Sequence, residues 1–284
     1  MAMIESRYID VDGINTHYLE AGAGETVVLL HSGEFGGAAE ISWEYTLPAL
    51  AQHFRVVAPD WLGFGRTEKI YDFGNQRARV FRHMRRFVAV MGIKRADFIG
   101  NSMGGSNLAA IAGEPEPILP LRSIVLSSGG GFTPLTPERK VLLAYDGTPA
   151  AMSAVLKAML HDPKWGDDAA YVERRQVLAT MPGAWECASA PRLKLPSTTP
   201  EAAAFGRPDS VKYENVSVPA LIIAGAEDRL REPGYAQQVA ARIRGSEVHV
   251  YERCGHCPNI EMSERFNAHV IDFLKRVHRA QPSR

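Results

Sequence analysis

The sequence predicts an α/β protein in which helices flank a mainly parallel sheet, with a helical insertion between two parts of that sheet. Short apolar runs bounded by glycine or proline are typical of strands buried on both faces, for example 26–30 and 220–224. Strand and helix patterns alternate up to Gly131, and they alternate again from Ala220 onward. Because such alternation builds parallel sheets, we expect one sheet assembled from both ends of the chain.

The first 131 residues are predicted to begin with a hairpin and to continue as strand–helix units. Two strand-like runs, 8–11 and 14–20, flank Asp12-Gly13, a dipeptide that favours a tight hairpin turn. Within 80–91 the apolar residues recur at helical spacing, and a glycine follows where the helix should end. The other elements predicted here are strands over 26–30, 54–58, 96–99 and 123–127 and a helix over 104–112.

The stretch 132–216 breaks the alternation, because it contains mainly helical or irregular patterns. Its predicted helices cover 138–145, 150–160 and 169–180. After it, the chain returns to predicted strands at 220–224 and 247–251, a helix at 235–243, and a last amphipathic helix built on Phe266, Val270, Phe273, Leu274 and Val277. We therefore predict that 1–131 and 217–284 form the two parts of one α/β core. The segment 132–216 is predicted to form a helical cap over the active site.

The composition favours an ordinary globular protein. Of the 284 residues, 45% are hydrophobic and 23% are charged. Lys plus Arg and Asp plus Glu both number 32, so the formal net charge of zero gives no electrostatic attraction to nucleic acid or to an anionic membrane. The apolar runs are far shorter than the roughly 20 residues that span a bilayer. With no apolar signal region and three cysteines, an odd number, we expect a cytoplasmic protein whose partner is a small molecule, with neither nucleic acid nor membrane bound.

A candidate nucleophile lies in the segment Gly100-Asn101-Ser102-Met103-Gly104. This segment follows the predicted strand 96–99 and opens the predicted helix. A serine in a sharp strand-to-helix turn has an exposed hydroxyl, and flanking glycines avoid collisions with the neighbouring strand and helix. The helix N-terminus also directs free N–H groups toward developing negative charge. The alternative is a glycine-rich turn with an incidental serine, and the strand–turn–helix context favours the nucleophile.

A candidate acid and base follow later in the chain. A serine needs a base to take its proton, and the base needs an orienting acid. Asp228 comes just after the predicted strand 220–224, and His256 comes just after the strand 247–251. Both strand ends lie on the edge of the sheet where open parallel sheets place their sites. Glu227 is a rival for the role of the acid, and Asp228 could also be a turn residue or a helix cap.

A candidate oxyanion hole involves the turn His31-Ser32-Gly33, which follows the first buried strand. The backbone N–H groups of Gly33 and Met103 could together bind a developing oxyanion. A glycine-rich turn without a catalytic use is the alternative interpretation of this segment.

From His31 to the last helix, the chain resembles the α/β-hydrolase family. More narrowly, the segments 98–105 and 253–256, with Glu261 and Phe266-Asn267 downstream, are similar to those of the meta-cleavage-product hydrolases. The resemblance implies hydrolysis of a carbon–carbon bond in 2-hydroxy-6-oxohexa-2,4-dienoates during bacterial breakdown of aromatic rings, without a cofactor. It implies a substrate-binding asparagine at Asn101 and dimers or larger oligomers. A cap arginine that holds the substrate carboxylate matches Arg174, counted back from Pro182, with Arg175 as its neighbour.

The sequence also departs from that family pattern. The family usually shows His-Gly-x-Gly-Pro-Gly at the oxyanion loop, whereas this chain has 31–37 as His-Ser-Gly-Glu-Phe-Gly-Gly. The family often has tryptophan after the catalytic histidine, where this chain has Cys257. Carboxylesterases and lactonases share the same serine turn, so hydrolysis of a small ester or lactone is the alternative activity. The substrate, the bond that breaks and the oligomeric state stay open.

Three functions of other classes are weaker interpretations. Cys254-Gly255-His256-Cys257 matches a dithiol redox motif, but it lies near the end of a chain far longer than a thioredoxin fold. A zinc site would need a second pair of ligands, which Cys187 alone does not supply, so we expect no metal. A non-catalytic scaffold is possible because fold does not fix function. The candidate serine, acid and histidine favour an enzyme.

Overall fold

The computed structural model describes residues 3–193, 206 and 208–281. In this part of the chain, eight strands form one sheet in the order β1-β2-β4-β3-β5-β6-β7-β8. The bounds of the strands are β1 Glu5–Val11, β2 Ile14–Ala21, β3 Thr26–Leu30, β4 Arg55–Pro59, β5 Ala96–Asn101, β6 Leu121–Ser127, β7 Ala220–Gly225 and β8 Glu247–Tyr251. Strand β2 pairs antiparallel with β1 and with β4, and the other neighbours pair in parallel. The predicted mainly parallel α/β sheet is confirmed.

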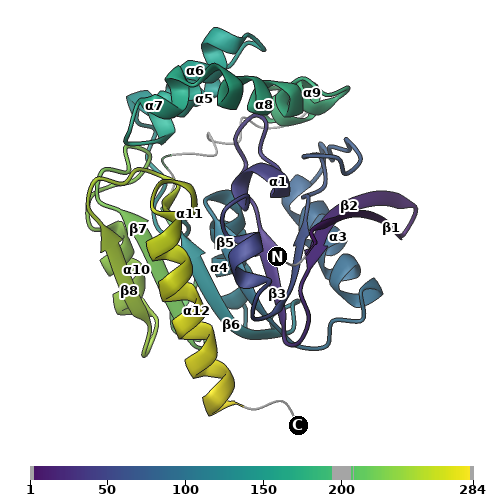
Figure 1. Ribbon diagram of the computed structural model, residues 1–284, viewed down its shortest axis with the longest axis vertical. Coiled ribbons are helices and arrows are strands. Elements are labelled where there is room, and N and C mark those ends of the chain that lie inside the picture. The colour runs from purple at the N-terminus through teal and green to yellow at the C-terminus, as the bar shows by residue number, and fades with distance from the viewer. Residues whose placement is uncertain (1–2, 194–205, 207, 282–284) are drawn as a thin grey trace.

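Helices flank this sheet and form a further layer beyond one of its edges (Figure 1). Those that pack on the sheet or its loops are α1 Ala39–Ser42, α2 Leu47–Leu50, α3 Gln76–Val90, α4 Met103–Ala112, α10 Tyr235–Arg242, α11 Pro258–Glu261 and α12 Ser263–Ala280. The further layer consists of α5 Pro137–Leu143, α6 Pro149–Met159, α7 Lys164–Asp167, α8 Ala169–Ala179 and α9 Ala184–Ser189. The long helices agree with the predicted ones to within a few residues at their ends. The sequence patterns missed α1, α2, α7, α9 and α11, because four to six residues are too few to show a helical period.

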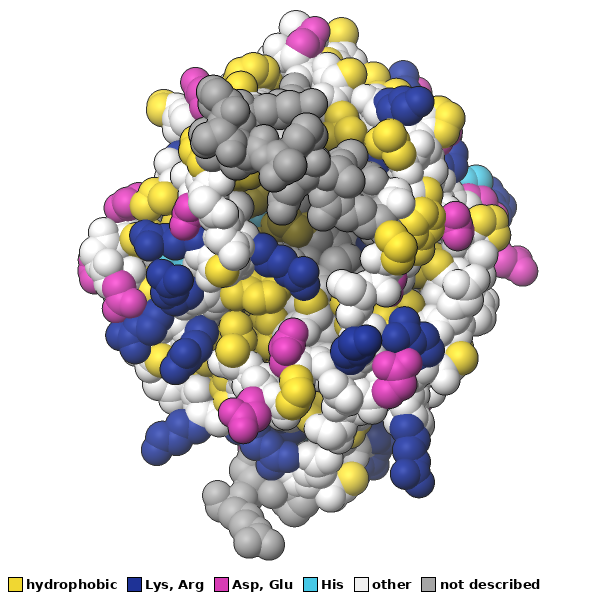
Figure 2. Space-filling view, turned by 180° about the vertical axis from the view of Figure 1, so that it is seen from behind, with side chains coloured by type: hydrophobic (Ala, Val, Ile, Leu, Met, Phe, Trp, Pro, Cys, Tyr) yellow, Lys and Arg dark blue, Asp and Glu magenta, His cyan; other side chains and the backbone are white. Residues whose placement is uncertain are grey.

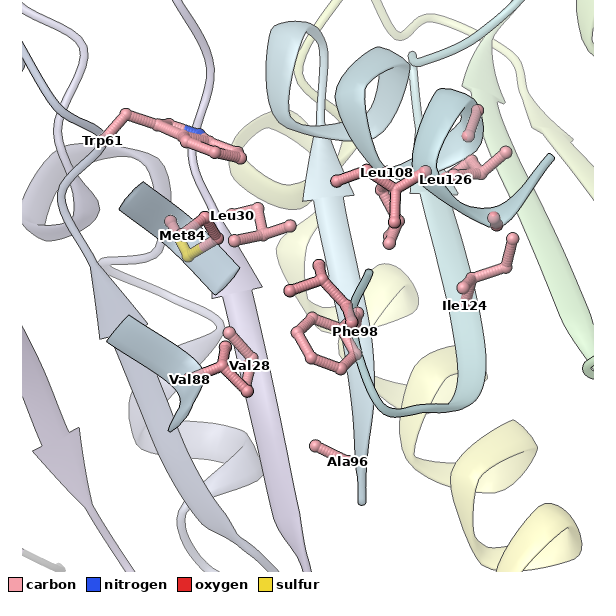
Figure 3. Packing of buried hydrophobic residues seen from close by; sticks show 14 of the residues in the cluster. Val28, Leu30, Trp61, Met84, Val88, Ala96, Phe98, Leu108, Ile124 and Leu126 are labelled. Atoms are coloured by element: carbon pink, nitrogen blue, oxygen red, sulfur yellow. The ribbon is translucent and has the colours of Figure 1, made fainter. Parts of the chain in front are cut away.

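The core has two parts, one on each face of the sheet. Successive strand residues point to opposite faces, so Val28 and Leu30 belong to one cluster and Val27 and Leu29 to the other. Figure 3 shows the first cluster, in which side chains of β3, β5 and β6 pack against Met84 of α3 and residues of α4. The second cluster includes apolar residues of α2 and α12. Because both faces are covered, the strands appear in the sequence as continuous apolar runs.

The insertion joins the core through a third cluster. Buried residues of α6 and α8, among them Leu156 and Tyr171, pack with Phe35, Leu230 and Cys257 from loops of the core. The backbone N–H of residue 256 also donates to the carbonyl of residue 159, at the end of α6, over 2.8 Å. These contacts place α5 to α9 over the loops that follow the parallel strands. The division into segments 1–131, 132–216 and 217–284 stays a prediction.

Charged side chains of both signs are scattered over the face of the molecule in Figure 2. Among the residues that the structure describes, no helix is long and apolar enough to cross a membrane. The expectation that nucleic acid is not a partner stays a prediction.

Phe98 allows a test of this core, because its ring is fully buried in the middle of the sheet. Phe98→Ala should lower the free energy of unfolding by about 3–5 kcal/mol, since it removes buried contacts and leaves a cavity. Phe73→Ala is the matched control, because that ring is 46% exposed, and it should change stability by about 0.5 kcal/mol or less. Urea unfolding measures both values. Similar losses in the two variants would show that Phe98 does not occupy the core.

Candidate active site

The candidate nucleophile Ser102 lies between β5 and α4 in a strained backbone conformation. Its φ is 52° and its ψ is −112°, a combination that residues other than glycine rarely adopt. The turn can be this sharp because glycines flank it. A Cβ at Gly104 would lie 2.2 Å from the carbonyl oxygen of Leu30, and one at Gly100 would lie 2.5 Å from the backbone of Gly104. The turn therefore presents the Ser102 hydroxyl at the edge of the sheet, as the sequence predicts.

The structure brings the three predicted side chains into one hydrogen-bonded chain. Ser102 Oγ lies 2.7 Å from Nε2 of His256, and Nδ1 of that ring lies 2.7 Å from Oδ2 of Asp228. The histidine and the aspartate are buried, whereas the serine is partly exposed. A carboxylate on Nδ1 fixes the tautomer that leaves Nε2 free to accept the serine proton. The arrangement can therefore deprotonate Ser102.

The surroundings of Asp228 keep it ionised. Burial by itself would raise the pKa of this carboxyl, but the facing His256 ring and the Arg231 guanidinium hold it below its usual value. Arg231 is buried and donates to the carbonyls of Ser128 and Gly130. Sequence reasoning missed Arg231, since an arginine three residues after an acid has no motif that distinguishes it from a surface residue.

Glu227, the rival for the role of the acid, has a different task. Its Oε2 accepts a hydrogen bond from the backbone N–H of Cys254 over 2.9 Å. That bond ties the loop after β7 to the loop after β8, which also contains His256. Glu227 thus supports the backbone of the site, and Asp228 is the carboxylate that contacts the histidine ring.

The two residues predicted to supply the oxyanion donors, Gly33 and Met103, lie close together. A Cβ at Gly33 would lie 2.5 Å from Sδ of Met103 and 2.9 Å from its Cβ, so this position requires glycine. Met103 is the first residue of α4, where a backbone N–H has no partner within the helix. The turn that directly follows Gly33, residues 34–37, is closed by a hydrogen bond of 2.8 Å from the N–H of Gly37 to the carbonyl of Glu34. The geometry is compatible with an oxyanion hole, and that role stays a prediction.

Asn101 is fully buried behind the hydrogen-bonded chain. Its Nδ2 donates to the Ser127 carbonyl over 3.2 Å and reaches the carbonyl of His256 over 3.5 Å. These bonds connect the end of β6 with the loop that contains the histidine. In this structure the amide is engaged with protein atoms, and contact between Asn101 and a substrate stays a prediction.

The two neighbouring arginines of α8 differ in environment. Arg174, the predicted carboxylate ligand, has a side chain that is 51% exposed and pairs with Glu44 over 2.8 Å. Arg175 is buried and pairs with Glu34 over 2.6 Å. A substrate-binding role for Arg174 stays a prediction and requires its guanidinium to leave Glu44. The sequence contained one signal for the Arg175 contact. Glu34 is a charged residue in a loop that the family pattern fills mainly with glycine.

A second Ser-His-Asp chain shows why distances alone do not define the site. Ser6 Oγ lies 2.8 Å from Nε2 of His17, whose Nδ1 lies 2.7 Å from Oδ2 of Asp60. Ser6, however, lies inside the extended strand β1, so no helix N-terminus follows it to stabilise an oxyanion. The Asp60 carboxylate also accepts the backbone N–H groups of Ala39 and Arg66, a structural use that ties the loop after β4 to the start of α1.

The cysteines next to His256 do not have the character of redox thiols. Both Cys254 and Cys257 are buried and free, and burial raises the pKa of each thiol. A reactive cysteine needs a lowered pKa and access to solvent. In the described part of the chain, no group of three or more His, Cys, Asp or Glu side chains could hold a metal ion. The expected independence from cofactors stays a prediction.

Comparison with known proteins agrees with this geometry. The model of the Alpha/beta hydrolase family matches residues 27–269. The 2-hydroxy-6-oxo-6-(2'-aminophenyl)hexa-2,4-dienoic acid hydrolase of Metapseudomonas resinovorans is 30% identical, over 95% of this chain and 91% of the relative. The 2-hydroxymuconate semialdehyde hydrolase of Pseudomonas sp. (strain CF600) is also 30% identical, over 94% and 93% of the two chains.

Solved structures give the same result. The meta-cleavage product hydrolase from Pseudomonas fluorescens IP01 superposes with a TM-score of 0.83 at 25% identity. The superposition covers 95% of this chain and 97% of the other. Together with the match of the family model, this likeness confirms the predicted family. The chain belongs to the α/β-hydrolase family, and its relatives there are meta-cleavage-product hydrolases.

Proposed function

We propose that this enzyme hydrolyses the carbon–carbon bond of a 2-hydroxy-6-oxo-dienoate formed by ring cleavage during aromatic degradation. The observation that supports it most directly is the Ser102–His256–Asp228 chain at a strained strand-to-helix turn beneath the helical layer. The names and high coverage of the relatives support the choice of substrate class.

In the proposed mechanism, Ser102, His256 and Asp228 are the catalytic residues. His256 acts as general acid and base: the 2-hydroxyl group loses its proton and carbon 5 gains one, so the dienol becomes a 2-oxo-3-ene. The Ser102 oxygen, or a water molecule, then adds to the 6-oxo carbonyl while the histidine takes the proton of the nucleophile. The N–H groups of Gly33 and Met103 stabilise the resulting oxyanion. Collapse of this adduct breaks the bond between carbons 5 and 6, and the electron pair passes into the 2-oxo-3-ene to give a dienolate that is then protonated. Where Ser102 is the nucleophile, water hydrolyses the acyl-enzyme that remains. Asp228 stabilises the imidazolium, and the low pKa of its carboxyl suits that task.

The substrate carboxylate is proposed to bind Arg174 of the cap segment 132–216, with Asn101 near the reacting end. The side chain of Arg174 is 51% exposed, so a substrate carboxylate can reach its guanidinium and replace Glu44, whose own side chain is 12% exposed. We propose further that the enzyme works in the cytoplasm as a homodimer or larger oligomer, without a cofactor. The free cysteines support a reducing compartment.

One observation favours the second candidate, a carboxylesterase or lactonase. Arg174 and Arg175 are both paired with protein carboxylates in this structure, and a neutral ester would leave these pairs intact. Measuring turnover of a ring-cleavage dienoate beside a p-nitrophenyl ester distinguishes the two activities. Rapid turnover of the dienoate is the expected result. Turnover of the ester alone would support the second candidate.

Ser102→Ala should lower turnover of either substrate by several orders of magnitude, because the three catalytic residues act as a unit. The fold should stay intact, since the replacement only removes a partly exposed hydroxyl. Steady-state kinetics and circular dichroism measure both properties. A folded variant with a near-normal rate would rule out the serine mechanism.

Asp228→Asn should cost about 10⁴-fold in rate, because an amide stabilises the wrong tautomer of the histidine. Glu227→Gln is the matched control, since it makes the same change one residue away in a side chain that accepts a hydrogen bond from the backbone of Cys254. It should affect stability more than rate. If the control loses more activity than Asp228→Asn, the acid is Glu227.

Arg174→Gln should lower kcat/KM for the dienoate by about 10- to 1,000-fold. The reason is that the variant loses one or two charged hydrogen bonds to the substrate carboxylate, each worth about 1.5–3 kcal/mol. A small neutral p-nitrophenyl ester has no carboxylate to bind, so its turnover should be spared. Comparison of kcat/KM for the two substrates measures this selectivity. Equal losses would mean that Arg174 has a structural role.

A further inference from the structure

The loop that contains Gly33 is tied to the helical layer by one buried ion pair. Glu34 follows Gly33 directly in the chain, and its Oε1 lies 2.6 Å from a terminal nitrogen of Arg175 in α8. The side chains are only 1% and 3% exposed. The other terminal nitrogen of Arg175 donates to the hydroxyl of Tyr171 over 3.1 Å. This cap–loop ion pair, Glu34 with Arg175, thus connects the oxyanion loop to a helix that is about 140 residues away in sequence.

Both groups of the cap–loop ion pair are charged. Burial alone would favour the neutral acid, but the Arg175 guanidinium and the Ser32 hydroxyl keep the pKa of Glu34 below its usual value. A buried ion pair of this kind holds its two elements in one geometry, because separating the charges leaves each without a partner in a poorly solvated site. The pair is therefore a specific positional restraint and not an adjustable surface contact.

The backbone of the loop also fits closely against α8. A Cβ at Gly36, whose φ is +76°, would lie 2.5 Å from the carbonyl oxygen of Arg175 and 3.4 Å from the Ala179 side chain. The ring of Phe35 packs against Tyr145 of the helical layer, with centroids 4.7 Å apart. Three successive loop residues, 34 to 36, thus contact the cap, while Gly33 on their other side contacts Met103. Because residues 34–36 are in contact with the helical layer and are bonded in sequence to Gly33, a displacement of α8 would also displace Gly33.

We propose that Glu34 and Arg175 are positioning residues, through which the cap sets the place of the Gly33 backbone N–H in the oxyanion hole. This inference rests on the proposed function of Ser102 and Gly33. It makes the oxyanion hole a joint product of core and cap: the core supplies both donors, and α8 fixes one of them. Misplacement of a catalytic group by about 1 Å can cost about 100-fold in rate, so the restraint matters for turnover.

The test replaces the pair without leaving a buried charge. In Glu34→Met with Arg175→Met, apolar side chains of similar length replace both charges, and such exchanges are often neutral for stability. The readout is the second-order rate at which a fluorophosphonate probe labels Ser102. In that reaction the serine oxygen bonds to phosphorus, fluoride leaves, and the base takes the hydroxyl proton. The negative charge that develops on the phosphoryl oxygen needs the oxyanion hole.

The double variant should be labelled about 10- to 100-fold more slowly than the unmodified enzyme. The pH profile of labelling, which follows protonation of the base, should keep its midpoint, because the catalytic chain itself is untouched. Arg229→Met is the control: this guanidinium also ties core to cap, through the carbonyls of Lys157 and Leu160, but it does not touch the oxyanion loop. It should keep the normal labelling rate.

Each result decides between the possibilities. Thermal unfolding of the double variant establishes that it is folded, and Glu34→Gln with Arg175→Gln replaces it if the methionine pair does not fold. A folded variant labelled at the normal rate would overturn the positioning role and leave the proposed function intact. A shifted pH midpoint would also overturn it, because the damage would then lie in the catalytic chain. An unmodified enzyme that resists the probe would overturn the serine mechanism and this inference with it.

Discussion

The close approach of β3, β5 and α4 is the constraint on which the rest of the site depends. Glycines at 100 and 104 let the chain turn within one residue, and Ser102 accepts an unfavourable backbone conformation as a result. The surrounding sheet and helix fix that conformation, since they are held by extensive apolar clusters on both faces. The strain thus has a use: the hydroxyl projects from the sheet edge, and the first N–H groups of α4 lie directly behind it.

The core and the catalytic chain could be predicted from the sequence because both follow local rules. Buried strands are continuous apolar runs, and the chain order of serine, acid and histidine places Asp228 and His256 at two neighbouring strand ends. The distances of 2.7 Å between them could not be predicted, because they depend on the packing of loops that are far apart in sequence. Short helices such as α1 and α11 could not be predicted for another reason: they have too few turns to show a helical period.

The contacts of charged side chains were the least predictable part. Successive residues of a helix point about 100° apart, so Arg174 and Arg175 face different surroundings although their residue type is the same. Which of the two is buried depends on the orientation of α8 about its own axis relative to the core, and the sequence does not reveal that orientation. Arg231 presents the same problem, since its partners are mostly carbonyl and hydroxyl groups, which leave no trace in the residue pattern.

The place where the helical layer enters the core has an evolutionary consequence. Strands β6 and β7 are parallel neighbours in the sheet, so the segment between them leaves at the carboxyl end of β6 and returns at the amino end of β7. The entropy of closing such a connection grows only slowly with its length, so the segment can change in length at little cost to the stability of the sheet. Substrate range can therefore diversify by replacement of this module while the catalytic chain is inherited unchanged. Glu34 is the exception. A replacement segment that supplies no guanidinium to Glu34 would leave a buried carboxylate without a partner, so the loop and the helical layer must be inherited together.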